Sequence, residues 1–305
     1  MPEVIEILNA EDYPAQIERA ADALRKGGLV VLPTETVYGA AGLLTQPKAH
    51  DQLRKLRGGE VRKPFIVHLA TPQDAGKFLG PISELGRRMM RKLWPGPVAL
   101  IFSVPSDRRA AVAGEFALDQ RDLYEDSKIT LRCPDHPLAS DILASVDGPV
   151  ALTRVDSSNW SLLNGKVDLV FDAGASKYSK ASTILQVLEN RYEIVREGVY
   201  DRRIIERLMR TTILFVCSGN TCRSPMAESL ARLAIGKKLG ASPEELEHRG
   251  INVLSAGAFA MPGARAAAQA VDAVAELGGD LTRHRSRTLS VELIHQADHI
   301  FTMSR

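Results

Sequence analysis

The chain has 305 residues, of which 45% are hydrophobic, and its formal net charge at pH 7 is +2. This length suggests about two domains, and the small net charge argues against a nucleic-acid-binding surface recognised by charge alone. Three cysteines do not make a disulfide framework, the N-terminus lacks the basic residues of a signal peptide, and no apolar run approaches the roughly 18 residues of a membrane span. We therefore expect a cytoplasmic protein without a membrane partner.

The first two thirds of the chain alternate predicted strands and helices. Residues 15–26 place apolar side chains on one helical face, and Gly27 with Gly28 ends that helix. The apolar run 29–33 predicts a buried strand that leads into a polar turn at 34–39. Further strands are predicted at 65–69, 98–102, 129–132, 149–153 and 167–171, with a strand pair at 182–196. Further helices are predicted around Leu53 and Leu56, from Thr71 onward, up to Trp94, and at 200–209.

The polar residues of this region have ordinary explanations when they are taken one at a time. Lys55 and Arg57 on a helix usually face solvent, His68 in a strand is usually a satisfied core histidine, and Ser182 before a strand commonly belongs to a turn. Neither G-x-G-x-x-G nor G-x-x-x-x-G-K-S/T is present. The residues alone indicate only an α/β domain suited to an anionic ligand.

The order of short motifs in this region is more informative. The motifs are P-T-E-T-V-Y-G, K-x-R, K-P-F-I-V-H, W-P-G-P, L-R-C-P-D-H-P, S-S-N, S-T-I and V-R-E-G. In this order they resemble the YrdC-like threonylcarbamoyl-AMP synthase family, and we expect that domain over residues 1–207. The resemblance implies a twisted mixed-sheet α/β fold and a reaction that converts L-threonine, bicarbonate and ATP into threonylcarbamoyl-AMP and pyrophosphate. The product would serve tRNA modification through downstream transferase proteins, which makes tRNA an indirect partner.

The same resemblance implies two sets of binding residues. Threonine would be bound by Thr36, His68, Arg132 and Ser182, with Arg132 holding the carboxylate. ATP would be bound by Lys55, Arg57, Lys63, Ser157, Asn159 and Arg196. ATP would act as a substrate together with Mg²⁺, and no tightly bound cofactor is expected.

Three departures from the family pattern concern the ATP side. The loop 57–64 is longer than usual, T-R-V-D precedes Ser157 with Trp160 shortly after it, and Ala99 stands where the family generally has Thr. We therefore expect threonine binding to be retained better than adenylation.

A second stretch that carries chemistry is I-L-F-V-C-S-G-N-T-C-R-S at residues 213–224. It predicts a buried strand ending on Cys217, a tight loop, and a helix that starts near Arg223. Such a loop directs backbone N–H groups and a helix dipole at one point, where an anion is favoured. Arg223 supplies a planar fork for phosphate, and the positive surroundings lower the pKa of Cys217, which favours a thiolate nucleophile. The ordinary alternative is a buried cysteine beside an unrelated arginine.

The spacing C-x-x-N-x-x-R-S followed by Pro resembles the active-site loop of the low-molecular-weight protein phosphatases. The resemblance implies roles for four residues: Cys217 as nucleophile, Arg223 as phosphate clamp, Asn220 as loop support and Ser224 as a hydroxyl that helps the thiolate leave. The rest of the phosphate loop would be Ser218, Gly219, Thr221 and Cys222. Thr221 resembles the residue found in the bacterial protein-arginine phosphatases, whereas tyrosine-specific members usually carry a bulkier side chain. The S-A-G at 255–257 and a helix at 264–277 also match.

The family's general acid is an aspartate in an Asp-Pro pair, and it has no counterpart in this sequence. The aspartates after Cys217 are Asp272, Asp280 and Asp298, and none precedes a proline. We therefore expect residues 211–305 to form an incomplete, C-terminally truncated doubly wound parallel-sheet domain. Without the acid, turnover should be lower by about 10²–10⁴-fold.

Several functions remain open from the sequence. The main hypothesis is a threonylcarbamoyl-AMP synthase fused to a phosphatase-like module. The alternatives are a phosphatase acting on phosphorylated protein as the main activity, a non-catalytic phosphate- or double-stranded-RNA-binding protein, and an arsenate reductase, which the missing redox cysteines disfavour. No metal site is expected, because His295 and His299 lack the Glu of H-E-x-x-H and a third ligand, and Cys133 with His136 stands alone.

Overall fold

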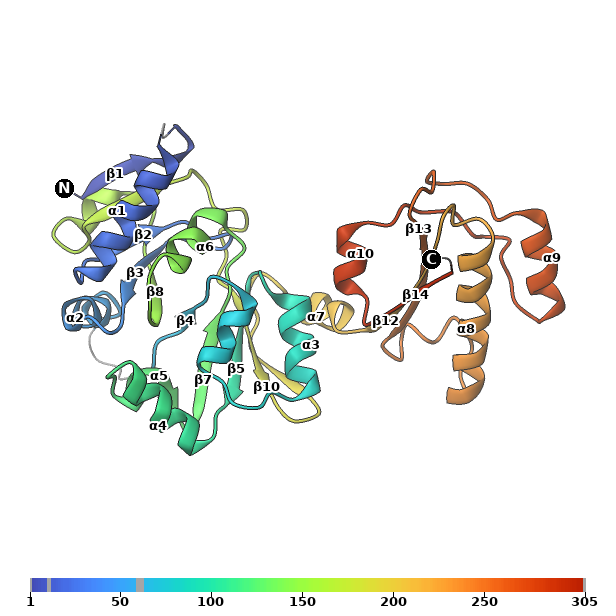
Figure 1. Cartoon of the computed structure of the whole chain (residues 1–305), viewed down its shortest axis with the longest axis horizontal. Coiled ribbons are helices and arrows are strands. Elements are labelled where there is room, and N and C mark those ends of the chain that lie inside the picture. Colours follow the sequence, from blue (N-terminus) through green and yellow to red (C-terminus); the bar gives the residue numbers. More distant parts are fainter. Residues whose placement is uncertain (1, 10–11, 59–62, 304–305) are drawn as a thin grey trace. The chain divides into compact units, whose positions relative to one another are not determined.

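The computed structural model describes residues 2–9, 12–58 and 63–303. The chain forms two compact units, Met1–Arg202 and Arg203–Arg305, which Figure 1 colours from blue to yellow and from yellow to red. Within the described residues, no helix has both the length and the apolar character needed to cross a bilayer.

The first unit is built on one eleven-stranded mixed sheet, which confirms the predicted α/β class. The strand order is β1-β9-β2-β3-β8-β4-β7-β5-β10-β11, and β6 pairs with β7. The pairs β1–β9, β2–β9, β4–β7 and β5–β10 are parallel, and the other pairs are antiparallel. The strands are β1 (Glu3–Glu6), β2 (Val30–Leu32), β3 (Gly39–Leu43), β4 (Val67–His68), β5 (Val98–Ser103), β6 (Tyr124–Glu125), β7 (Lys128–Arg132), β8 (Val150–Arg154), β9 (Leu169–Asp172), β10 (Thr183–Val187) and β11 (Tyr192–Arg196).

Helices α1 and α6 cover the half of this sheet that contains β2 and β9. Leu24 of α1 and Ile142 of α6 belong to one fully buried cluster with Val30 and Phe171. Asp12 starts α1 by accepting a hydrogen bond from the Ala15 amide (3.1 Å). The helices of this unit are α1 (Tyr13–Arg25), α2 (Pro47–Leu56), α3 (Glu84–Leu93), α4 (Ser106–Glu115), α5 (Gln120–Leu123) and α6 (Pro137–Ala144), with 3₁₀ turns η1 (Ile7–Asn9), η2 (Pro72–Lys77) and η3 (Trp160–Leu163); α7 (Arg202–Leu208) lies at the division between the units.

Some elements differ from those expected. The strand expected at 65–69 pairs only over Val67–His68, and the helix expected after Thr71 is the short 3₁₀ turn η2. Thr71 and Asp74 form a capping box there, which satisfies two backbone amides but does not extend the helix. Strand β3 was not predicted, because its sequence G-A-A-G-L has small residues and no β-branched side chain.

The second unit is a parallel sheet of three strands in the order β13-β12-β14. Figure 1 shows α8 and α10 on opposite sides of these strands. Leu293 of α10 packs on Leu214 and Val216, whereas Met226 of α8 packs with Val274 of α9. The elements are β12 (Thr211–Cys217), α8 (Arg223–Leu239), β13 (Ile251–Gly257), α9 (Ala268–Glu276), α10 (Val291–Gln296) and β14 (His299–Thr302), so the helix expected at 264–277 is shorter than predicted.

Gly198 fixes a close approach between the segment after β11 and the start of β10. The Thr183 hydroxyl donates to the Tyr200 carbonyl (2.6 Å) and accepts from the Gly198 and Tyr200 amides (3.2 and 3.0 Å). A Cβ atom on Gly198 would lie 2.3 Å from the Ala181 oxygen and 2.5 Å from the Ser182 oxygen. Both are backbone atoms, so the chain must move to accept any side chain.

We predict that Gly198→Ala lowers the free energy of unfolding of the first unit by about 1–3 kcal/mol, because the added methyl group overpacks this junction. Denaturant titration of the full chain, followed by tryptophan fluorescence, measures the change. The matched control is Gly114→Ala in α4, where a Cβ meets nothing within 4 Å. An equal midpoint for the two variants would contradict the prediction.

Candidate functional site

A buried ion pair joins the end of β7 to the polar turn after β2. Arg132 is 5% exposed and Glu35 is 3% exposed. The Arg132 Nη2 donates to Glu35 Oε1 (3.0 Å) and to Thr36 Oγ1 (2.7 Å), and Glu35 Oε2 accepts from the Asp135 amide (3.2 Å). A buried charge is tolerated when it is paired and hydrogen-bonded. The pair therefore fixes the turn on the sheet and holds Arg132 in place.

The turn itself is organised by the Thr34 hydroxyl. It donates to the Val37 carbonyl (2.5 Å), accepts from the Val37 amide (3.1 Å) and lies 2.9 Å from Thr36 Oγ1. The backbone of the turn is therefore satisfied locally, although Thr34, Glu35 and Thr36 are all buried.

A cavity of about 210 Å³ opens beside this turn. Three of the four residues expected to bind threonine line it, namely His68, Arg132 and Ser182. The fourth, Thr36, is bonded to Arg132 and lines the adjoining cavity. The structure thus brings the four residues together from four separate segments.

His68 is neutral in this cavity. Burial, and then the neighbouring Arg132, lower the pKa of His68 to about 3, against a smaller opposing effect of the Ile66 carbonyl. The His68 Nδ1 lies 3.1 Å from that carbonyl, which can only accept, so Nδ1 carries the proton and Nε2 is an acceptor. The positive charge at the cavity comes from Arg132, Arg154 and Arg196.

Arg196, which the resemblance assigns to ATP, lines the same cavity as His68, Arg132 and Ser182. Its guanidinium donates to the Ser182 carbonyl from Nε (3.3 Å) and Nη2 (2.8 Å). Burial, and then the nearby Arg132, lower the pKa of Arg196. Two guanidinium groups on one small cavity favour an anionic ligand.

A second cavity of about 500 Å³ adjoins the first and shares Val37, Tyr38 and Arg154 with it. Ser157, one of the residues expected to bind ATP, lines it. Trp160, which departs from the family pattern, is held near it: its Nε1 donates to Asp172 Oδ2 (3.0 Å), and its ring meets Tyr38 edge-on at 5.2 Å. Trp160 therefore supports a wall of this cavity through Tyr38.

The other expected ATP residues lie elsewhere among the described residues. Lys55 lines a separate hollow with Lys166. Arg57 stacks on the Phe65 ring (4.9 Å to the centroid) and donates to the carbonyl of the exposed Lys63 (3.3 Å). Asn159 caps η3 by accepting from the Ser161 amide (2.9 Å). Part of the loop between Arg57 and Lys63, residues 59–62, lies outside the described residues.

The second unit carries a compact loop between β12 and α8. Cys217 ends the central strand and is 5% exposed, and Ser218–Cys222 connects it to α8. The Cys217 Sγ lies 3.0 Å from Ser224 Oγ and accepts from the Asn220 amide (3.2 Å). Thr221 and the exposed Cys222 complete the loop.

Asn220 holds this loop from within. It has a positive φ of 53° and is fully buried. Its Nδ2 donates to Ser224 Oγ and Ser255 Oγ (both 2.9 Å), and its Oδ1 accepts from the Arg287 amide (2.8 Å). Four satisfied contacts of one side chain and its amide offset the strain of the left-handed backbone.

The Cys217 thiol is more acidic than an ordinary cysteine. Burial alone raises its pKa, but hydrogen bonds from the Ser224 side chain and from the amides of Ser224, Asn220 and Gly219 outweigh burial and lower it. These groups stabilise the thiolate, which is the nucleophilic form of cysteine.

Arg223 opens α8, and its guanidinium donates to the Met303 carbonyl (3.1 Å) and to Ser218 Oγ (3.4 Å). Two aspartates of this unit bond to backbone amides outside the Cys217 loop. Asp298 accepts from the Thr212 amide (2.8 Å), and Asp280 accepts from the Thr282 amide (2.7 Å). No cluster of three His, Cys, Asp or Glu side chains suited to a metal exists within residues 2–9, 12–58 and 63–303.

Sequence reasoning assigned no role to several residues that the structure places at these sites. They are Glu35, Tyr38 and Arg154 in the first unit, and Glu228, Ser255, His284 and Arg287 in the second. Glu35 carried a signal, because a carboxylate between two apolar strands needs a partner. The others lie far along the chain from the groups that they contact.

Each unit is similar to a family of known proteins. Residues 22–198 match the Sua5/YciO/YrdC family, described as telomere recombination, and residues 212–305 match the low molecular weight phosphotyrosine protein phosphatase family. A threonylcarbamoyl-AMP synthase of Bacillus subtilis is 27% identical over 204 residues, which is 64% of this chain and 56% of the relative. A probable low molecular weight protein-tyrosine-phosphatase, EpsP of Ralstonia solanacearum, is 40% identical over 95 residues, which is 31% of this chain and 57% of the relative.

A solved structure supports the fold. The crystal structure of Pyrococcus abyssi Sua5 complexed with L-threonine aligns with a TM-score of 0.56 at 15% identity, covering 100% of both chains. At this identity the likeness concerns the fold alone. The chain spans a little over half the length of the Bacillus and Ralstonia relatives.

We predict that Ser224→Ala raises the pH at which Cys217 becomes reactive. Alkylation by iodoacetamide requires the thiolate, so the alkylation rate rises as the pH passes through the pKa of the Cys217 thiol. Because that pKa is lowered in the parent chain, the rise occurs there at a lower pH than for an ordinary cysteine. Loss of a hydrogen bond to a charged group, about 1.5–3 kcal/mol, should move the inflection upward by about 1–2 pH units. The measurement uses a Cys222→Ser background so that the exposed thiol is absent.

The control for this experiment is Ser229→Ala, another buried serine of α8, whose hydroxyl lies at the Asp280 carbonyl and not at Cys217. An inflection that moves equally in both variants would show that Ser224 acts through helix stability and not through the thiolate.

Proposed function

Because the chain belongs to the Sua5/YciO/YrdC family over residues 22–198, we propose that its first unit is an L-threonylcarbamoyladenylate synthase. It joins L-threonine, bicarbonate and ATP, and releases threonylcarbamoyl-AMP, pyrophosphate and water. The observation that carries this proposal is the 210 Å³ cavity on which His68, Arg132 and Ser182 converge, with Thr36 bonded to Arg132.

Arg132 is the group that binds the threonine carboxylate. Its Nη2 is engaged by Glu35 and Thr36, and its buried Nε has no hydrogen-bond partner among the described residues. A guanidinium with a free buried donor, held rigid by a carboxylate, suits a second carboxylate. The neutral His68 and the Ser182 hydroxyl supply uncharged contacts for the rest of the amino acid.

ATP occupies the adjoining 500 Å³ cavity, whose shared residues bring its α-phosphate next to the threonine site. Ser157 lines this cavity, and Arg154 faces both ligands. Lys55, Arg57, Lys63 and Asn159 would reach the nucleotide from outside this cavity. Proteins rarely bind Mg²⁺ through protein ligands alone, so Mg²⁺ would enter bound to the ATP phosphates and neutralise part of their charge.

The chemistry needs alignment more than an acid or base. The threonine nitrogen forms a bond to the bicarbonate carbon with loss of water, and a carbamate oxygen then attacks the α-phosphorus. The bond from phosphorus to the bridging oxygen breaks, and pyrophosphate leaves with the electron pair. Arg154 and Arg196 stabilise the charge that builds on the phosphate, as fixed cations do in a pre-organised site. The product would pass to cytoplasmic transferase proteins that modify tRNA.

We predict that the purified chain releases pyrophosphate from ATP only when threonine and bicarbonate are both present. Arg132→Lys should lower kcat/KM for threonine by about 10²-fold, because a charge-assisted hydrogen bond from the guanidinium, worth about 3 kcal/mol, is lost while the buried charge is kept. Arg191→Gln, which changes an exposed arginine paired with Glu193 on the hairpin, is the control and should leave the rate unchanged.

Lys55→Ala separates catalysis from binding in the same assay. If the parent chain releases pyrophosphate with threonine and Lys55→Ala abolishes that release, the synthase is supported. If the parent chain shows no such release and Lys55→Ala only weakens ligand binding, the synthase is rejected in favour of a binding module. Calorimetry with threonine alone tests the claim that threonine binding is retained better than adenylation.

A second activity is favoured by the lowered pKa of Cys217 and the loop around it. In the proposed step, Cys217 Sγ attacks phosphorus, and the bond from phosphorus to the leaving atom breaks, which is an oxygen in a phosphate ester and a nitrogen in phosphoarginine. The leaving group takes the electron pair and a proton from solvent. Water later attacks the phosphorus of the thiophosphate and releases phosphate and the Cys217 thiolate. Arg223 would turn from the Met303 carbonyl to the phosphate oxygens. Phosphorylated protein is the proposed substrate, and Thr221 favours phosphoarginine over phosphotyrosine.

We predict that this phosphatase activity depends steeply on the leaving group. Asp280 and Asp298 bond to backbone amides outside the Cys217 loop, and none of the three aspartates after Cys217 precedes a proline as the family's acid does, so the leaving oxygen departs unprotonated. Phenyl phosphate should be cleaved about 10²–10⁴-fold more slowly than p-nitrophenyl phosphate, whose leaving group needs no proton. Cys217→Ser should abolish both rates, and similar rates for the two substrates in the parent chain would refute the prediction.

A further inference from the structure

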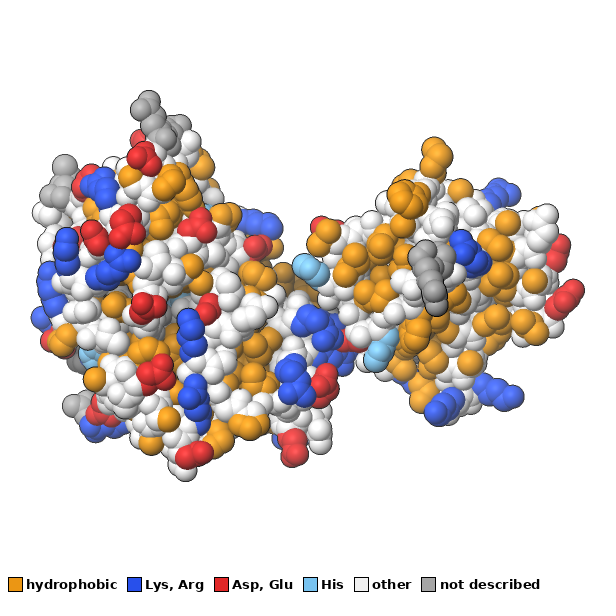
Figure 2. Space-filling model, in the orientation of Figure 1, with side chains coloured by type: hydrophobic (Ala, Val, Ile, Leu, Met, Phe, Trp, Pro, Cys, Tyr) orange, Lys and Arg blue, Asp and Glu red, His pale blue; other side chains and the backbone are white. Residues whose placement is uncertain are grey.

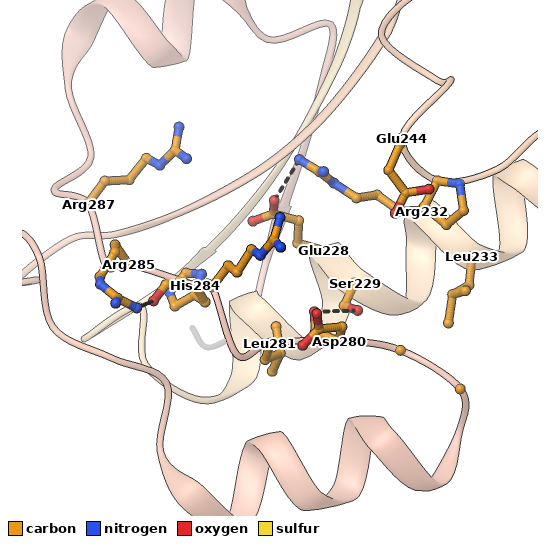
Figure 3. A pocket seen from close by; sticks show the side chains of 14 residues that line it. Glu228, Ser229, Arg232, Leu233, Glu244, Asp280, Leu281, His284, Arg285 and Arg287 are labelled. Atoms are coloured by element: carbon orange, nitrogen blue, oxygen red, sulfur yellow. Dashed lines mark hydrogen bonds and ion pairs between the residues drawn. The ribbon is translucent and has the colours of Figure 1, made fainter.

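A cavity of about 470 Å³ lies beside α8 in the second unit, apart from the lining of the Cys217 loop. Figure 3 shows its walls, which come from α8, from Glu244 after that helix, and from the segment 278–287. Neither Arg223 nor any residue of Cys217–Cys222 is among the described residues that line it.

The cavity is built by a pair of glycines. Gly278 has a φ of +82°, and a Cβ atom on Gly279 would lie 2.5 Å from Val274 Cγ1 and 2.7 Å from Ser229 Oγ. The Ser229 hydroxyl also donates to the Asp280 carbonyl (3.4 Å), as Figure 3 shows. The turn that forms one wall is therefore held against α8 by contacts that a larger residue would break.

The cavity is richer in arginine than in carboxylate. Its ionisable residues are Arg232, Arg283, Arg285 and Arg287 with His284, against Glu228, Glu244 and Asp280. Arg232 pairs with Glu228 (2.9 Å) and donates to the Val253 carbonyl (2.8 Å), so this pair is neutral and engaged. Arg287 extends away from the other side chains in Figure 3.

Arg283 and Arg285 supply the available cationic groups. Within the described residues, the Arg283 side chain makes no hydrogen bond or ion pair, and Arg285 donates from Nη1 to the His284 carbonyl (2.6 Å). Asp280 is held by the Thr282 amide, and that hydrogen bond, with a smaller effect of Arg283, lowers its pKa. Guanidinium forks without carboxylate partners match phosphate oxygens.

The volume suits a ligand larger than one phosphate. Pockets for small ligands span about 300–1,000 Å³. Leu233, Pro243 and Leu281 add an apolar part to the wall. We propose that this cavity is a binding site for a small anion that carries two linked phosphates, held by Arg283 and Arg285.

The site is positioned to act on the Cys217 loop. His284 Nε2 lies 2.8 Å from the Asn220 carbonyl, and Glu228 Oε2 accepts from Ser255 Oγ (2.6 Å), which contacts Asn220 Nδ2. Two residues of the cavity wall thus support the residue that holds the loop. Occupancy of the cavity is linked to the loop through Asn220.

Hydrogen exchange read by peptide tests the proposal on the full chain, because it separates this cavity from the synthase site. Pyrophosphate should slow exchange in peptides covering 228–233 and 278–287, with half-saturation at least tenfold lower than for orthophosphate. Arg283→Gln combined with Arg285→Gln should weaken this protection at least tenfold. Arg249→Gln, an exposed arginine of the same unit outside the cavity, is the matched control and should leave protection unchanged.

ADP distinguishes the two sources of a diphosphate: protection equal to that by pyrophosphate supports a nucleotide, and none supports free pyrophosphate. The thermal midpoint and the protection of 213–224 by orthophosphate verify that the double variant is folded. Protection confined to 213–224, protection that survives in the folded double variant, or equal half-saturation by orthophosphate and pyrophosphate would overturn the proposal.

Discussion

The buried ion pair of Arg132 and Glu35 is the constraint on which the first unit's site depends. Burying a guanidinium to 5% exposure at the end of β7 costs stability unless the charge is paired, and Glu35 is a carboxylate that reaches it. The pair also draws in Thr36 and the Asp135 amide. One electrostatic requirement therefore fixes two loops and leaves Arg132 with a donor for a ligand.

The second unit depends on a different constraint, which is the stabilisation of the Cys217 thiolate. A thiolate next to a tight loop must be surrounded by hydrogen-bond donors, and the loop that carries these donors must keep its conformation. Asn220 satisfies both needs, since its amide contacts Cys217 while its side chain spans Ser224 and Ser255. Glu228 accepts from Ser255, and His284 contacts the Asn220 carbonyl, so the conformation of the loop depends on the residues packed behind it.

Both units thus gather cationic or N–H groups in one place, although the whole chain carries a net charge of only +2. The charge is local: arginines gather at the 210 Å³ cavity of the first unit and at the cavity beside α8, while basic and acidic side chains lie interspersed on the face of the first unit that Figure 2 shows. Net charge therefore says little about ligands when a few groups are buried or concentrated.

The α/β class, the mixed and parallel sheets, and the strand, loop and helix around Cys217 could be predicted from the sequence alone. These features follow from local apolar runs and from motifs that are continuous in the chain. The sequence also named Thr36, His68, Arg132 and Ser182 together, through the order of their motifs. Three sets of contacts became known only from the folded structure: Arg196 lines the cavity of His68, Arg132 and Ser182, Trp160 packs against Tyr38, and Glu228 and His284 support Asn220. These contacts join residues that lie far apart in the sequence, and the residues next to each one in the chain do not indicate its partner. Strand order and the close approach of loops arise from packing of the whole sheet.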